Sequence, residues 1–501
     1  MTGIPIVTSG NGLLGKLGTW LLVLATGGLL LVLGVETFNA LYYGPWSDDY
    51  FLFRTAGILA DLDIEPLTYL MFGSLLVLLM MGLPLAFVTG GLGVVFIYLV
   101  GDAAMLNIIP GRIFPLMANP DLAAIPLFIF MATLLERAGL IEEMFSVVYK
   151  WMGGIHGGLA AATILASTIL AAMVGVIGAA VVTMGIIALP AMLKYGYDKG
   201  LACGAIAASG TLGQIIPPSI ILILLGDVVG VPVGELFAAA VVPGLILVAG
   251  FIVYILIIAY LRPNLAPTLP TRDDGAGLGR QVLKSLLPPL FLVVAVLGSI
   301  FFGVASPTES AAVGALGAMI LAALHKRMTY KNLRDTANQT TRLTSMVFMI
   351  LVGATAFGLV FRSMGGDFVV EELMMEIPGG KWGFIAVSML TIFTLGFFLD
   401  FLEICFIVVP ILAPIAEMMD INMLWFAVLI AMNLQTSFLT PPFGFSLFYL
   451  KATAPPEVKI QHIYRGVIPF VLIQVTVLGL LIAFPDIVQW LPDLVNEWSD
   501  F

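Results

Sequence analysis

Apolar runs long enough to cross a lipid bilayer recur along this chain from Trp20 to Phe484, with only short polar breaks between them. A membrane-spanning helix needs about 20 apolar residues, and it satisfies every backbone polar group within the hydrocarbon layer. Only 10% of the 501 residues are charged, whereas about a quarter are charged in soluble domains. The sequence therefore predicts an all-α, multi-pass membrane protein and excludes a soluble enzyme.

Charge and motif content exclude several further classes. The net charge of −10 offers no basic footprint for nucleic acid. Cys203 and Cys405 lie far apart in apolar segments, which fits neither a disulfide framework nor a zinc site. Because no Walker A sequence occurs, nothing in the chain indicates direct nucleotide hydrolysis. The first apolar stretch, 17–35, is too long for a typical signal peptide, and we expect a retained helix.

An internal repeat relates the two halves of the chain. Three pairs of landmarks share one offset of 224 residues (441 − 217 = 224): Pro217 and Pro441, Pro190 and Pro414, Gly93 and Gly317. A single offset over so much sequence indicates duplication. The predicted organisation is an N-terminal transmembrane helix and external segment at 1–66, repeat 1 at 67–261, a cytoplasmic linker at 262–284, repeat 2 at 285–485 and a tail at 486–501.

Basic residues give equivalent loops opposite orientations. Segment 325–342 is rich in Lys and Arg, which mark the cytoplasmic side, whereas 364–380 is acidic. The loop 194–199 carries two lysines, but its equivalent, 417–420, carries none. We therefore expect two inverted-topology repeats, as in many secondary transporters, with a cytoplasmic amino terminus and an external carboxyl end.

Two segments predict re-entrant hairpins, because each is nearly long enough for two crossings and yet has both flanks on one side. The first lies at about 157–191, with its tip at Gly175 to Gly178, and the second at 380–414, with its tip at Gly396 to Asp400. Glycine at the first tip permits a tight turn. Each repeat is thus expected to hold five full spans and one hairpin.

Each double proline must interrupt a helix, because proline lacks an amide hydrogen and displaces the preceding residue from helical geometry. A lone double proline usually marks only a kink. Two at symmetric positions, both flanked by polar residues, favour a site where freed carbonyls meet a cation and half-helix amino termini meet an anion. The flanking candidates near a substrate are Ser209, Thr211, Gln214, Ser219, Asn433, Gln435 and Thr436.

Carboxylates within spans are costly and are candidates for function. Asp400 and Glu403 lie at the second predicted tip, where Asp400 either caps a half-helix or belongs to an ion site, and Glu403 either shares that site or faces water. Glu309 follows Ser306-Pro307 and is expected to cap a helix start.

Four strings in order resemble the large membrane subunit of tripartite ATP-independent periplasmic (TRAP) transporters over residues 67–485. They are GAIAASGTLGQIIPPSIILILLGDVVG, SPTESAAVGALGA, FLDFLEICFIVVPILAPIAE and NLQTSFLTPPFGFSLFYLKA. The resemblance implies an elevator-type fold in the bacterial inner membrane and sodium-driven uptake of an organic acid, with no cofactor beyond the coupling ions. It implies two partners, a small four-helix membrane subunit and a periplasmic solute-binding protein.

The resemblance also implies two sodium sites. The first would lie near Gly175, Gly178, Gly213, Ile216 and Pro218, and the second near Gly396, Asp400, Ser437, Thr440 and Pro442. The first tip, 173–178, departs from relatives that often carry serine or asparagine there, so carbonyls would have to replace side-chain ligands.

Three rival functions remain open. A channel also uses broken helices and carbonyls, but it does not require an inverted repeat with paired hairpins. An intramembrane enzyme would need a nucleophile and base or a metal cluster that three histidines and two cysteines do not supply. A symporter working without a binding protein, or a proton-coupled carrier, is the third.

Overall fold

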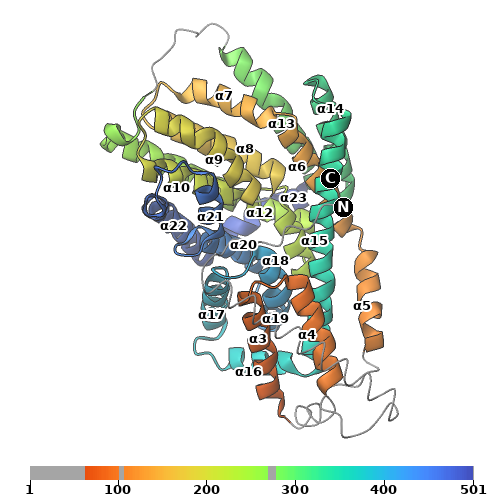
Figure 1. Ribbon diagram of the computed structural model, residues 1–501. Helices are drawn as coiled ribbons and strands as arrows, with labels where there is room; N and C mark the ends of the chain where they lie inside the picture. Colours follow the sequence, from red (N-terminus) through yellow and green to blue (C-terminus); the bar gives the residue numbers. More distant parts are fainter. Residues whose placement is uncertain (1–61, 101–105, 176, 269–277, 500–501) are drawn as a thin grey trace. The chain divides into compact units, whose positions relative to one another are not determined.

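The computed structural model describes residues 62–100, 106–175, 177–268 and 278–499, and every regular element among them is a helix (Figure 1). The all-α prediction is confirmed for this part of the chain. The predicted N-terminal helix at 17–35, most of the segment 1–66 and part of the predicted linker lie outside the described residues.

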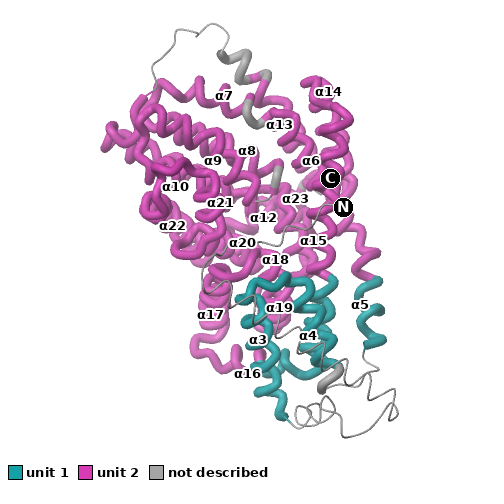
Figure 2. Tube along the Cα trace, in the orientation of Figure 1, with its two compact units in different colours: residues 1–114, 352–369 teal, residues 115–351, 370–501 magenta. Residues whose placement is uncertain are grey.

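The chain divides into two compact units (Figure 2). The first unit comprises residues 1–114 and 352–369, and its described helices are α3 (Ile64–Met80), α4 (Leu85–Val100) and parts of α5 (Ile108–Met117), α15 (Tyr330–Ser363) and α16 (Gly366–Met375). The remainder of the chain, 115–351 and 370–501, forms the second unit.

The second unit contains the remaining helices. In chain order they are η2 (Asp121–Ala123), α6 (Ala124–Arg137), α7 (Leu140–Met152), α8 (Gly158–Val174), α9 (Ile177–Lys194), α10 (Lys199–Thr211), η3 (Leu212–Gln214), α11 (Ile220–Val229), α12 (Val233–Leu261), η4 (Pro263–Leu265), α13 (Leu278–Phe301), α14 (Pro307–Leu324), α17 (Gly380–Leu395), α18 (Phe401–Glu403), the π-helix η5 (Ile404–Val408), α19 (Val409–Met418), α20 (Met423–Leu439), α21 (Phe445–Thr453), α22 (Ile460–Ala483) and α23 (Asp486–Ser499).

Aromatic rings and glycines pack the first unit. The ring of Phe72 on α3 meets that of Phe361 on α15 edge-on, with centroids 5.2 Å apart. A Cβ atom added to Gly93 on α4 would lie 3.2 Å from the backbone of Ala356. Because no side chain separates α4 from α15 at this point, the helices approach closely, as is common between membrane helices.

Glycines also bring α10 and α22 together in the second unit, where the two helices lie side by side (Figure 1). A Cβ atom added to Gly204 would overlap the backbone carbonyl of Gly466. The two backbones therefore touch directly. Nearby, the ring of Phe470 on α22 packs edge-on against Phe251 on α12, with centroids 5.2 Å apart.

The 224-residue offset recurs in the helix boundaries. Helix α9 spans Ile177–Lys194, and α18, η5 and α19 together span Phe401–Met418 (401 − 177 = 224; 418 − 194 = 224). The helix caps repeat as well, because Asp198 accepts the amide of Leu201 and Asn422 that of Trp425, each at 2.9 Å (422 − 198 = 224). Local sequence thus starts equivalent helices in the same way.

Glu309 caps a helix, as the sequence predicts. Its carboxylate accepts the amide of Ser306 at 2.8 Å, and the Ser306 hydroxyl accepts the amide of Glu309 at 3.3 Å. This reciprocal capping box opens α14, with Pro307 at the first helical position. The capping role predicted for Glu309 is confirmed.

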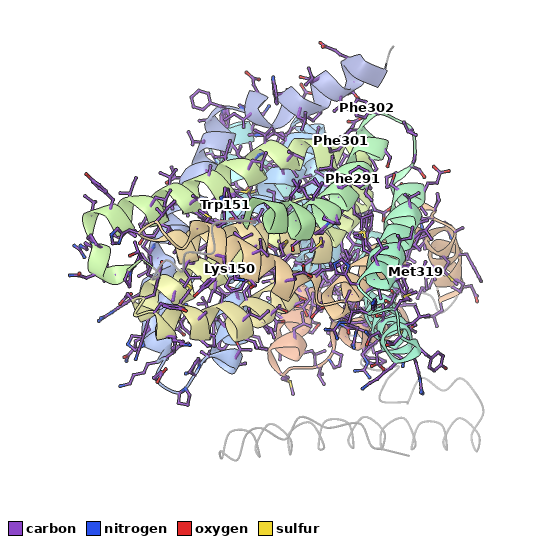
Figure 3. The ribbon with its side chains drawn as sticks, turned by 90° about the horizontal axis from the view of Figure 1, so that it is seen from above. Lys150, Trp151, Phe291, Phe301, Phe302 and Met319 are labelled. Carbon is purple, nitrogen blue, oxygen red and sulfur yellow. The ribbon has the colours of Figure 1, made fainter. Side chains whose placement is uncertain are left out.

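The helices carry apolar surfaces suited to a membrane. Among the described residues, six helices are long and apolar enough to cross a bilayer, or seven if α5 and α6 form one bent span, and shorter apolar helices accompany them. Figure 3 shows Trp151 on α7 and Phe291 on α13 at the surface of the second unit, where they are 58% and 67% exposed. Large exposed apolar side chains of this kind fit contact with lipid or with another membrane subunit.

Candidate functional site

The first double proline interrupts the helical path between α10 and α11. Helix α10 runs into the short turn η3, and α11 starts only after Ser219. Pro217 and Pro218, joined by a cis peptide bond, cannot donate amide hydrogens to continue the helix. The predicted break is confirmed.

Backbone oxygens remain available at this first break. Among the described residues, no donor hydrogen-bonds to the carbonyl oxygens of Gly213, Ile216 or Pro218. The Gln214 carbonyl is different, because it accepts the Ser219 hydroxyl at 3.0 Å. Three carbonyl oxygens within six residues are therefore free to accept a bond, and oxygen is the ligand type that hard cations prefer.

The first hairpin tip lies against this break. Helices α8 and α9 meet at Gly175, whose φ of +62° is the left-handed conformation that favours glycine. A Cβ atom added to Gly175 would lie 3.3 Å from the amide nitrogen of Ile220, and one added to Gly213 would lie 3.4 Å from the Cβ of Ala171. Gly178, in contrast, faces the ring of Tyr449, at 3.2 Å from an added Cβ atom. The structure thus places Gly175 beside Ile220, places Gly213 beside α8, and directs Gly178 toward α21.

The second double proline interrupts the path between α20 and α21 and also contains a cis bond, Pro441–Pro442. Here the equivalent carbonyls are occupied. Those of Ser437 and Thr440 each accept a backbone amide at 3.1 Å, and that of Pro442 accepts the Tyr464 hydroxyl at 2.8 Å. At the second break the backbone carbonyls therefore accept hydrogen bonds, whereas the equivalent carbonyls of the first break accept none from the described residues.

Hydroxyl groups replace the open carbonyls at the second break. Ser437 and Thr440 stand where the first break has Gly213 and Ile216 (437 − 213 = 224; 440 − 216 = 224). Their hydroxyls donate to helix carbonyls at 2.8 and 2.7 Å. A hydroxyl that donates keeps its acceptor lone pairs, so both side chains can still coordinate a cation.

The second hairpin tip lies against the second break. A Cβ atom added to Gly396 would overlap the hydroxyl of Ser437, so only glycine fits there. The ring of Phe398 at the tip packs on that of Phe443, which follows the double proline, with centroids 5.4 Å apart. Tip and break thus adjoin in both halves of the chain.

Asp400 and Glu403 form a reciprocal cap at the second tip. Asp400 accepts the amide of Phe401 at 2.8 Å, and Glu403 accepts the amide of Asp400 at 3.0 Å. The capping geometry expected as one alternative for Asp400 is present, and Glu403 bonds to backbone instead of only facing water. The π-helix η5 follows directly, a local irregularity that often accompanies functional sites.

A family model described as "Tripartite ATP-independent periplasmic transporter, DctM component" matches residues 72–487. The chain belongs to this family. It is therefore the large permease component of a TRAP transporter, a multi-pass protein of the bacterial inner membrane and not an enzyme. The resemblance found in the sequence is confirmed.

Curated relatives of the permease match most of this chain, two of them over nearly their whole length. The ectoine/5-hydroxyectoine TRAP transporter large permease UehC of Ruegeria pomeroyi is 32% identical, over 84% of this chain and 98% of the relative. The C4-dicarboxylate TRAP transporter large permease DctM of Rhodobacter capsulatus is 29% identical, over 85% and 99%. The sialic acid TRAP transporter permease SiaT of Haemophilus influenzae is 29% identical, over 75% and 60%.

A solved structure shares the fold. The crystal structure of the YdaH transporter of Alcanivorax borkumensis matches with a TM-score of 0.57, covering 84% of the permease and 99% of that chain at 14% sequence identity. At this identity the likeness concerns the fold alone.

The polar residues predicted near a substrate are all buried in the permease: Ser209, Thr211, Gln214, Ser219, Asn433, Gln435 and Thr436. Five of the seven have partners; Asn433, for example, donates to the Met389 carbonyl of the second hairpin at 2.6 Å. Gln214 and Gln435 differ, because neither end of either side-chain amide meets a partner among the described residues. Such buried groups are costly unless something pairs with them, so these two amides are candidates for contact with a polar ligand.

Three functional candidates were missed by sequence reasoning. Tyr464 and Gln474 on α22 reach the two breaks, and Asn119 bonds to Asp227 at 2.6 Å. Asn119 precedes a proline, a signal that could have indicated the interruption between α5 and α6. The two α22 residues carry no such local signal.

Proposed function

We propose that this permease imports an organic acid, delivered by a periplasmic binding protein and driven by a sodium gradient. One observation carries the proposal: each hairpin tip adjoins a double-proline break, and the two pairs are related by one offset of 224 residues (437 − 213 = 224). Two oxygen-rich interruptions at membrane depth, each closed by a tip, suit small cations that travel with an anion.

Sodium would occupy both tip-and-break pairs. At the first, the carbonyls of Gly213, Ile216 and Pro218 would serve as ligands beside Gly175. The second pair would use the hydroxyls of Ser437 and Thr440 beside Gly396, and Asp400 would supply negative charge. Because Gly178 faces Tyr449 and Pro442 is bonded to Tyr464, we assign these two residues to packing around the sites.

The substrate class follows from relatives. Their names give ectoines, C4-dicarboxylates and sialic acid as cargo, all of them small organic acids. Gln214 and Gln435, buried and without partners among the described residues, are the groups we propose to face the substrate or its carboxylate. Amides can donate to a carboxylate without repelling it.

The topology that we propose is two inverted repeats, 67–261 and 285–485, which operate as an elevator. The recurrence of helix boundaries supports duplication, and the basic residues support inversion. Single cysteines at positions 331 and 372 test it. The first should react with a membrane-impermeant reagent only from the cytoplasmic side and the second only from outside, and equal external labelling would contradict inversion.

A small membrane subunit on another chain and a periplasmic binding protein would complete the transporter, as family membership implies. The decisive test is uptake by the reconstituted complex, with and without the binding protein, in sodium and in potassium at a clamped membrane potential. We expect uptake only with sodium and the binding protein together. Equal uptake in potassium would favour proton coupling, and uptake without the binding protein would favour a stand-alone symporter.

A further inference from the structure

One helix, α22, reaches both breaks through polar side chains. Tyr464 donates its hydroxyl to the Pro442 carbonyl of the second break at 2.8 Å. Gln474 donates Nε2 to the hydroxyl oxygen of Thr211, immediately before the turn η3 of the first break, at 3.2 Å. The two side chains are ten residues apart on one continuous helix, which corresponds to about 15 Å along its axis.

Tyr464 bonds to the second break from a separate helix, α22, and not from the helices that flank the break. Ser446, by contrast, comes from the adjoining α21 and bonds to the Phe438 carbonyl at 2.9 Å. In the other half of the chain the position equivalent to Tyr464 is Ala240 (464 − 224 = 240), which has no hydroxyl. This support therefore belongs to the second break alone.

Gln474 supports the first break from a fully buried position. Thr211 uses its own hydrogen to bond the Ala208 carbonyl at 2.8 Å, so it is oriented to accept from Gln474. Two residues further on is the open carbonyl of Gly213. The Oε1 atom of Gln474 has no partner among the described residues, so this side chain is held by one bond only.

The body of α22 between these side chains is fixed against its neighbours. Gly466 touches the backbone of Gly204 on α10, and Phe470 packs on the rings of Phe251 and Tyr254 at centroid distances of 5.2 and 5.1 Å. Close-packed interiors transmit displacements instead of absorbing them. A shift of either break is thus passed to the same helix.

We propose that α22 is a shared support of the two breaks, with Tyr464 and Gln474 as positioning residues that couple ion binding at one break to ion binding at the other. The inference rests on the proposed function, since it presumes that sodium binds at both breaks. Neither side chain is a predicted ion ligand. Each instead holds a group beside the proposed ligands, Tyr464 the Pro442 carbonyl of the second break and Gln474 the Thr211 hydroxyl just before the first.

The test is sodium-dependent thermal stabilisation of the purified complex of permease and small subunit, titrated with sodium chloride against potassium chloride at constant ionic strength. The variants are Tyr464→Phe, Gln474→Met and the double variant. Matched controls are Tyr260→Phe, at a residue that is 84% exposed, and Gln461→Met, at an exposed position of α22 itself. Each control makes the same chemical change away from the breaks.

We expect each single variant to raise the half-saturating sodium concentration about three- to tenfold, the net value of one hydrogen bond, and to lower the Hill coefficient. The double variant should raise it by less than the product of the single effects, because both act through one helix. The half-saturating substrate concentration, measured at saturating sodium, should match wild type in every variant. The two control variants should match wild type in all of these quantities.

The inference would be overturned if both single variants kept the half-saturating sodium concentration and the Hill coefficient of wild type. It would also be overturned if the fold-changes of the single variants multiplied in the double variant while the Hill coefficient stayed at its wild-type value. Should Gln474→Met not fold, Thr211→Val removes the same hydrogen bond from its other side and must give the same shift. A wild type that melts at one temperature in sodium and in potassium would overturn the proposed function and the inference with it. The two failures are thereby separable.

Discussion

The two double-proline breaks occupy equivalent places in the chain but present their oxygens differently. The first leaves carbonyls of Gly213 and Ile216 open and has no hydroxyl at either position, whereas the second has hydroxyls at Ser437 and Thr440 and engages the carbonyls. The two halves therefore share the interruption but differ in the oxygen atoms that lie beside it. A site built of backbone depends on chain geometry, and a site built of side chains depends on residue identity.

The half-helices that follow the breaks differ as well. Helix α11 carries Asp227, which accepts a hydrogen bond from Asn119 in the turn before α6 at 2.6 Å. The equivalent residue on α21 is Lys451 (451 − 227 = 224), which donates to the Val458 carbonyl seven residues on, at 2.6 Å. The first half-helix is thus tied to a distant element and the second to its own loop.

The largest effect should come from closing the breaks themselves. Pro218→Ala and Pro442→Ala each restore an amide hydrogen, which lets the helix continue and removes oxygens from the site. We expect sodium-driven uptake to fall about a hundredfold in either variant, the loss of roughly two interactions with a charged group. Pro492→Ala, within α23, is the control and should transport normally. Normal uptake by Pro218→Ala would remove the first break from the mechanism.

The next largest effect should come from removing a side-chain hydroxyl that only the second break has. Thr440→Val replaces a hydroxyl by a methyl group of similar size, and we expect the half-saturating sodium concentration for uptake to rise about tenfold, as for a lost hydrogen bond to a charged group. The matched change at the first break, Ile216→Val, should shift it less than about twofold, because the carbonyl is retained. Equal shifts in the two variants would contradict the proposal that the second break uses a hydroxyl where the first uses a backbone carbonyl.

Asp400 offers a test that separates two roles of one side chain, because the effect is large only if the carboxylate compensates an ion. Asp400→Asn keeps the cap, because Asn and Asp cap about equally well, but it removes charge. Unit charges about 4 Å apart attract by roughly 4 kcal/mol at an effective dielectric near 20, so the half-saturating sodium concentration should rise by orders of magnitude if Asp400 compensates the ion. We expect Glu403→Gln to do little. An unchanged value for Asp400→Asn with normal maximal uptake would leave capping as the whole role of Asp400.

The smallest effects should be alike in the two halves. Asp198→Ala and Asn422→Ala each remove one helix cap, at a cost of about 1 kcal/mol of stability. Thermal melting of the purified complex should therefore drop by similar, modest amounts, and Gln461→Ala at an exposed helix position should not lower it. A large difference between the two cap variants would show that equivalent helix starts are not energetically equivalent.

The sequence was sufficient for features that single residues impose. Prolines 217 and 441 required breaks, Gly175 allowed a left-handed tip, and Ser306 with Glu309 fixed a helix start. These features depend on neighbours within a few residues, so spacing reveals them. The repeat offset was equally visible, because it needs only comparison of the chain with itself.

Contacts between distant segments were not predictable in this way. Gln474 meets Thr211 across 263 residues, and Tyr464 meets Pro442 only because α22 packs beside α20. Whether a carbonyl is open or occupied depends on such contacts, which no local pattern records. The sequence therefore located both breaks and the hydroxyls at the second, but it did not show which backbone carbonyls are occupied.

The direct backbone contact between Gly204 and Gly466 has a practical consequence for measuring motion. Because the two backbones touch and the helices pack together, we expect α10 and α22 to keep one separation through a transport cycle. Spin labels on the exposed ends of these two helices should therefore give one constant distance, which can serve as an internal reference. Changes in the distances from these two helices to α6 or α14 would then report movement of α6 or α14 relative to them.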